Sequence, residues 1–166
     1  MKKLFALALV TAALTPGMAL AATGNTATAT GTANATVVAP LQITHTAGAA
    51  LSFGPFTAGT GGTVAVSQAS VASVTGDVGL LTGGTVAADS FAVSGAGSRA
   101  FNIATSTGNT VTSGAASMAL TLSAPANATL SAGGAYTLRV GGTLTVAANQ
   151  AAGAYTGSYT VTVTYQ

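Results

Sequence analysis

The residues that could perform chemistry are few. The 166-residue chain has one histidine, His45, no cysteine, and only two acidic residues, Asp77 and Asp89. Acid–base and nucleophilic catalysis need a nucleophile beside a base, paired carboxylates or a metal site. Serine is plentiful, but the sequence has no glutamate and no second histidine to complete such a site. We therefore predict that the protein is not an enzyme and has no catalytic, cofactor-binding or metal-binding residues.

The histidine and the two aspartates have structural explanations. In "PLQITHT", Leu41, Ile43 and His45 fall on one face of an extended chain, so we interpret His45 as a structural residue at a strand end. Asp77 in "TGDVG" and Asp89 in "AADSF" occur where aspartate side chains accept bonds from local backbone amides, which predicts turn capping. A calcium site would recruit several oxygen ligands, often more than one carboxylate.

The charge pattern excludes one class of partner. Only 4% of residues are charged, against roughly 25% in ordinary domains. Without Lys2 and Lys3, Arg99 and Arg139 balance the two aspartates. Two arginines forty residues apart make no basic face, so we predict no nucleic-acid partner. Sheet edges that lack charged residues are prone to pair with other strands, so these edges are either covered within the fold or used for assembly.

The beginning of the chain has the pattern of a secretory signal. Lys2 and Lys3 precede the apolar run "LFALALVTAAL", and Ala19-Leu20-Ala21 fits the small-x-small cleavage pattern. We predict a signal peptide over 1–21, an N-terminal strand or extension over 22–38 and one domain over 39–166. No later stretch has the roughly 20 apolar residues of a membrane helix. The mature chain is thus expected to be exported and to contain no transmembrane segment.

The remaining sequence predicts an all-β domain. Short runs of alternating apolar and polar residues are separated by glycine-rich turns, which indicates a sandwich or a barrel. In "MALTLS", Met118, Leu120 and Leu122 are expected to point inward. We expect turns at three glycine pairs: 61–62, 83–84 and 141–142. The expected strands cover 40–46, 63–67, 91–95, 99–105, 118–123, 136–142, 143–147 and 155–166.

Both ends of the mature chain carry regular patterns. Thr and Ala alternate through "TGNTATATGTANATVVAP", residues 23–40. The last fourteen residues, "GAYTGSYTVTVTYQ", begin at Gly153, alternate, and place Tyr165 next to last. This end resembles the C-terminal strand of chaperone-usher pilins, and residues 26–38 resemble the donor extension with which one pilin completes its neighbour. The chain also looks like a family of small Thr/Ala/Gly-rich secreted bacterial domains of unknown function that share "LSFGPFTAG"-like segments.

The pilin resemblance implies an immunoglobulin-like antiparallel β-sandwich that is incomplete and is completed by a donated strand. It implies a noncovalent homopolymer of identical subunits, a periplasmic chaperone, an outer-membrane usher, and a route through the periplasm to a fimbria on the cell surface. The implied donor residues are Ala27, Ala29, Gly31, Ala33, Ala35 and Val37. The implied groove-strand residues are Gly153, Tyr155, Tyr159, Val161, Val163 and Tyr165. The alternative is a self-complete secreted sandwich that binds a surface polysaccharide or a protein.

Overall fold

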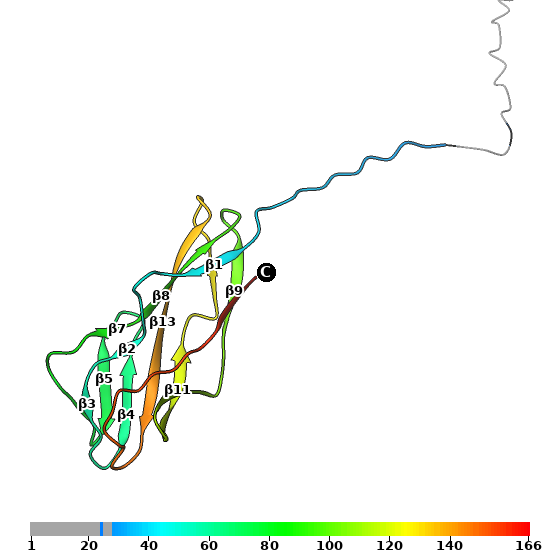
Figure 1. The fold of residues 1–166 in the computed structure, drawn as a ribbon. Coiled ribbons are helices and arrows are strands. Elements are labelled where there is room, and N and C mark those ends of the chain that lie inside the picture. The colour runs from blue at the N-terminus through cyan, green and yellow to red at the C-terminus, as the bar shows by residue number, and fades with distance from the viewer. Residues whose placement is uncertain (1–23, 25–27) are drawn as a thin grey trace, which may run out of the picture. The chain divides into compact units, whose positions relative to one another are not determined.

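The computed structural model describes Gly24 and residues 28–166 (Figure 1). The chain divides into two units, 1–35 and 36–166, and all the strands described below belong to the second. The predicted signal peptide and Ala27 lie outside the described residues. Residues 28–40 are exposed and form no strand, and the side chain of Val37 is 96% exposed. No helix in the described part of the chain is long and apolar enough to cross a membrane.

The second unit is an antiparallel all-β, sandwich-like domain. A seven-stranded sheet has the order β1-β8-β13-β11-β10, with β4 paired to β13 and β5 paired to β4. A three-stranded sheet has the order β12-β9-β14, and two ribbons pair β2 with β7 and β3 with β6. The strands are β1 Gln42–His45, β2 Ser52–Phe53, β3 Phe56–Thr57, β4 Gly62–Val66, β5 Ala72–Gly76, β6 Gly79–Leu80, β7 Val86–Ala87, β8 Asp89–Ser94, β9 Ala100–Thr105, β10 Asn109–Ser113, β11 Ala116–Ser123, β12 Asn127–Thr129, β13 Ala135–Val146 and β14 Val161–Tyr165.

The alternation in the sequence produces two apolar cores. Successive side chains of a strand point to opposite faces, so a period of two buries one face and exposes the other. The upper core joins the sheet of β1, β8 and β13 to the sheet of β9 and β14, and Phe101 and Leu138 are fully buried in it. The lower core lies on β4, β10, β11 and β13 and includes Val64, Met118 and Leu144. The inward orientation predicted for Met118 and Leu120 is confirmed, and Leu122 is half-buried.

One predicted turn is wrong. Gly141 and Gly142 do not separate two strands but lie inside β13, which runs through both halves of the domain (Figure 1). The first half of β13 pairs with β8, and the second half pairs with β11 and β4. A Cβ at Gly141 would collide with the carbonyl oxygen of Val66, and one at Gly142 would lie 3.0 Å from Leu51. These glycines therefore allow close packing at the point where β13 changes partners.

The predicted C-terminal strand is shorter than expected. Only Val161–Tyr165 forms a strand, and Gly153 precedes it by eight residues of irregular chain, in which Thr156 makes one bridge to Thr112. The predicted alternation is nevertheless present. The side chains of Tyr155, Tyr159, Val161, Val163 and Tyr165 are half-buried, whereas Thr160, Thr162 and Thr164 are exposed.

Candidate binding cleft

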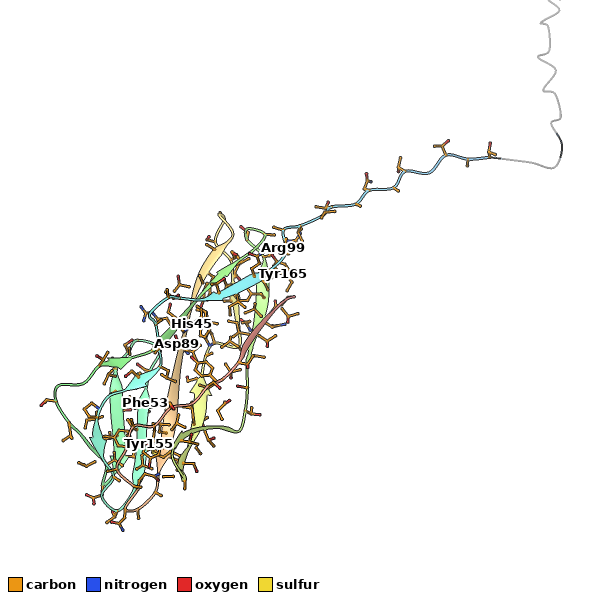
Figure 2. The ribbon with its side chains drawn as sticks, viewed as in Figure 1. His45, Phe53, Asp89, Arg99, Tyr155 and Tyr165 are labelled. Carbon is orange, nitrogen blue, oxygen red and sulfur yellow. The ribbon has the colours of Figure 1, made fainter. Side chains whose placement is uncertain are left out.

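A large cleft opens onto the lower core. It has a volume of about 1090 Å³ and lies between two walls, residues 49–58 and residues 150–159. Its floor consists of Val111 from β10, Met118 and Leu120 from β11, and Leu144 from β13. Figure 2 places Phe53 of the first wall and Tyr155 of the second in this lower half of the domain. The lower core thus lacks the continuous second sheet that covers the upper core.

The floor of the cleft is apolar and already packed. Met118 is 3% exposed and Leu144 is 3% exposed, so the cleft ends on core side chains. Phe53, Phe56 and Tyr155 pack against the same core from the two walls. Because apolar surface gains free energy when it leaves water, a segment that brings apolar side chains over this floor would be stabilised there.

The backbone of both walls has free hydrogen-bonding groups. Among the amides of residues 151–159, only that of Thr156 donates to a backbone carbonyl of the described chain, the carbonyl of Thr112. On the opposite wall, the amides of Ala50 and Leu51 also have no backbone partner within residues 28–166. Most of these residues are exposed, so their amides are accessible to the backbone of an incoming segment. An extended segment in the cleft could supply such partners along both walls.

Side chains hold the second wall against the sheet. The side-chain amide of Gln150 donates from Nε2 to the hydroxyl of Tyr155 over 2.9 Å and to the carbonyl of Ser117 in β11 over 3.2 Å. The hydroxyl of Tyr155 in turn donates to the carbonyl of Ala151 over 2.7 Å. These bonds fix residues 150–155 in place although the segment makes no continuous ladder. The wall is therefore shaped before any ligand binds.

A hydrogen-bonded cluster, the Asp89 network, closes the upper end of the cleft. Asp89, the first residue of β8, is 5% exposed. Its Oδ1 lies 2.7 Å from Nε2 of His45 and accepts the amide of Ser90 over 2.7 Å, while its Oδ2 accepts the hydroxyl of Tyr159 over 2.6 Å. Phe91 packs against both rings, 5.0 Å from His45 and 6.3 Å from Tyr159 between centroids. Figure 2 shows His45 and Asp89 side by side.

The environment of Tyr159 keeps its hydroxyl protonated. Burial, the hydrogen bond to Asp89 and the negative charge of that carboxylate all raise the pKa of Tyr159 well above its usual value. Tyr159 therefore donates to Asp89 throughout the physiological pH range. The network is a fixed structural connection, and no described group of three or more His, Cys, Asp or Glu residues could hold a metal ion.

The structure confirms the predicted roles of the two aspartates only in part. Asp77 lies in a turn, as predicted, but its Oδ2 accepts the amide of Thr60, 17 residues away, over 2.9 Å rather than a local amide. Asp89 accepts the amide of the adjacent Ser90, as predicted, but the predicted turn is wrong, because this residue begins a strand and its carboxylate points into the domain. Of the three bonding partners of Asp89, only Ser90 is adjacent in the sequence. His45 and Tyr159 are 44 and 70 residues away from Asp89 along the chain. His45 ends β1, as the strand pattern predicts.

The residues implied by the pilin resemblance fall into separate places. Gly153, Tyr155 and Tyr159 line the cleft, whereas Val161, Val163 and Tyr165 pack on the upper core. The hydroxyl of Tyr165 accepts the amide of Ala96 over 2.6 Å and donates to the carbonyl of Ala39 over 3.0 Å. The implied donor residues from Ala29 to Val37 are exposed. Their roles stay predictions.

The first wall of the cleft, residues 49–58, is not predicted from the sequence. Residues 49–58 contain two short strands, β2 and β3, around Gly54-Pro55, and so lack a run of alternation long enough to recognise. The available signal was the pair of aromatic residues Phe53 and Phe56 on either side of a turn dipeptide. Both are half-buried against the lower core.

Fold and cleft together define an antiparallel β-sandwich with a part-open core. The chain belongs to the family described as "Domain of unknown function (DUF4402)", whose model matches residues 41–165. No curated protein and no solved structure matches the chain. The matched range contains all the strands and both apolar cores. Residues 28–40 lie outside it.

Proposed function

We propose that the protein is a structural subunit of a bacterial surface pilus or fimbria, which polymerises noncovalently when one copy donates a strand to the next. The cleft over the lower core is the single observation that carries this proposal. It combines an apolar floor with two walls in which several backbone amides, those of Ala50 and Leu51 and most of those in 151–159, have no backbone partner within residues 28–166. Addition of a strand satisfies both needs at once, because the strand provides backbone hydrogen bonds and alternate side chains fill the groove.

The proposed occupant is the N-terminal segment of another copy, residues 26–38. Where the structure describes it, this segment is exposed and contributes to no strand, so its backbone is available for pairing. Its alternation gives one Thr-rich face for solvent and one face of small residues for the floor, for which the predicted set runs from Ala27 to Val37. Since Met118 and Leu120 already supply bulk from the floor, alanines allow the incoming backbone to approach closely.

The proposed assembly has further partners. A chain with an apolar cleft and unpaired edges needs protection before it meets its neighbour, because exposed edges recruit other strands. We assign this protection to a periplasmic chaperone and the assembly step to an outer-membrane usher, on the basis of the resemblance of the C-terminal strand to that of pilins. The protein would pass through the periplasm and reach the cell surface as a fimbria of identical subunits.

A gel of the cell-surface fraction tests the proposal. Samples are run in SDS unheated and boiled, for the intact chain and for a chain without residues 26–38. We expect a ladder that collapses on boiling and is absent from the deletion. A single monomer band in every unheated lane would refute strand donation and would favour a self-complete binding module.

Two matched substitutions sharpen this test. Ala33→Asp places a charge on the face proposed to enter the apolar cleft, and burial of an unpaired charge is costly. Thr32→Asp places the same charge on the face proposed to stay in water. We expect Ala33→Asp to abolish the ladder and Thr32→Asp to preserve it. Equal effects of the two substitutions would contradict the proposed orientation of the strand.

A further inference from the structure

The Asp89 network connects the two sides of the domain at the upper end of the cleft. His45 is the last residue of β1, and Tyr159 lies two residues before β14. β1 is an edge of the seven-stranded sheet and pairs only with β8 in the described chain. β14 is an edge of the three-stranded sheet and pairs only with β9 there. Asp89 accepts hydrogen bonds from His45 and Tyr159 and thereby connects the end of β1 to the segment that precedes β14.

Above the Asp89 network, side chains fill the gap between β1 and β14. Ile43 of β1 and Val161 and Val163 of β14 pack on the same upper core. At the far end, the hydroxyl of Tyr165 connects β14 to the carbonyl of Ala39 just before β1. The two strands contact each other, but no backbone pairing between them is present in the described chain. The gap is therefore filled although its backbone edges are unpaired.

Below the network the two sides diverge around the cleft. His45, Asp89, Phe91 and Tyr159 form the end of the cleft lining, and the walls continue from there as residues 49–58 and 150–159. The network thus marks the boundary between a closed upper half and an open lower half. The second wall, residues 150–159, has ten residues of mostly irregular chain, so it can accompany at most about ten residues of an extended strand, which rises about 3.3 Å per residue.

We propose that the Asp89 network is a stop that ends the donated strand, so that the strand occupies only the lower half of the domain and does not separate β1 from β14. This inference rests on the proposed function. It makes His45, Asp89 and Tyr159 positioning residues that determine how many donor residues are engaged. At most about ten residues of the segment 26–38 pair with the walls, and the remainder connects the two subunits.

A buried carboxylate suits this role better than an apolar side chain would. Burial of a charge is costly unless hydrogen bonds compensate for it, and apolar replacements of buried ion pairs are often neutral or stabilising. Directional bonds to His45, Ser90 and Tyr159 instead hold three segments at one fixed spacing. No side-chain N or O atom that is buried in the described residues lacks a partner, so the network is complete.

Residue-resolved amide hydrogen exchange tests the stop. The chain without residues 26–38 retains all the strands and both cores, so it is expected to fold, and a synthetic peptide of residues 26–38 is added as the donor. We expect the peptide to slow exchange at amides within 49–58 and 150–159 and to leave the outward amides of β1 and β14 unchanged. Slowed exchange along β1 and β14 would overturn the stop and leave strand donation intact. An absence of binding would overturn the proposed function, and the stop with it.

Substitutions then test whether the Asp89 network is what ends the donated strand. Asp89→Ala removes the acceptor for all three bonds, whereas Asp89→Asn keeps an isosteric group that can still bond to His45, Ser90 and Tyr159. We expect peptide-dependent protection to extend into Val161–Tyr165 in Asp89→Ala and to stop before β14 in Asp89→Asn. If Asp89→Ala does not fold, Tyr159→Phe replaces it, with Tyr136→Phe as the control that alters no network residue. A boundary that stays in place in a folded Asp89→Ala or Tyr159→Phe chain would refute the role of the network.

Discussion

Replacement of Tyr159 by phenylalanine tests the energetic basis of the Asp89 network. The substitution keeps the ring and removes only the hydroxyl that donates to Asp89 over 2.6 Å. A hydrogen bond to a charged group contributes roughly 1.5–3 kcal/mol, and its loss leaves a buried carboxylate oxygen without a donor. We expect Tyr159→Phe to lower the free energy of unfolding by about 2 kcal/mol at pH 8.

The same pair of proteins has a predicted pH dependence. The folded state raises the pKa of Tyr159 through burial, the hydrogen bond to Asp89 and the charge of Asp89, whereas the unfolded chain keeps the ordinary value of about 10. The stabilisation is therefore complete below pH ~10 and is lost as pH rises further, because the unfolded state releases the proton first. At pH 11 this linkage lowers the stability of the unsubstituted protein by at most about 1.4 kcal/mol. The phenylalanine side chain of the variant does not titrate, so the difference between the two proteins is smaller at pH 11 than at pH 8.

Urea unfolding followed by far-UV circular dichroism measures this difference. Chains without residues 26–38 are used at pH 8 and pH 11, so that assembly does not contribute. All other residues are the same in both proteins, so their contributions cancel in the comparison. A difference in the free energy of unfolding that stays constant or grows between the two pH values would refute the raised pKa of Tyr159 in the folded state.

Further substitutions test turn geometry, donor packing and the C-terminal strand. Gly76 and Gly108 have similar φ angles, 71° and 68°, but a Cβ at Gly76 would collide with the carbonyl of Gly61, whereas one at Gly108 meets nothing within 4 Å. Thermal unfolding should show the larger loss for Gly76→Ala, and equal losses would contradict the packing. Ala33→Val in the donor peptide adds two carbon atoms and should tighten binding by up to about 1.6 kcal/mol, measured by calorimetry; weaker binding would show that the floor does not accept them. Tyr165→Ser removes the ring and the phenolic hydroxyl that join β14 to Ala39 and should reduce surface filaments in electron micrographs, so unchanged filaments would count against the pilin proposal.

Regular alternation makes most of the sandwich predictable. The strands that contain Met118, Phe101 and Val163 follow a period of two, which fixes the buried face. Alternation does not show whether a glycine pair turns the chain or allows close packing, so the turn predicted at Gly141-Gly142 is wrong. That distinction depends on Val66 and Leu51, which approach from other parts of the chain.

The cleft is less predictable than the strands. Its C-terminal wall is predictable in part, because Tyr155 and Tyr159 share a face with the final strand. The other wall consists of two-residue strands, whose pairing with β6 and β7 depends on tertiary contacts. The role of Asp89 is not predictable, because local sequence cannot reveal partners that the fold supplies from β1 and the segment before β14.

The most direct test of the central claim uses Met118 as a probe of the cleft floor. With residues 1–21 and 26–38 removed, Met118 is the sole native methionine, and its side chain lies on the floor of the cleft. Its ¹³C-labelled methyl resonance is followed by NMR while a peptide of residues 26–38 is added, with the Ala33→Asp peptide as control. We predict a shift that saturates at one peptide per chain and is absent with the control. A resonance that does not move at any concentration of the unmodified peptide would contradict strand donation into this cleft.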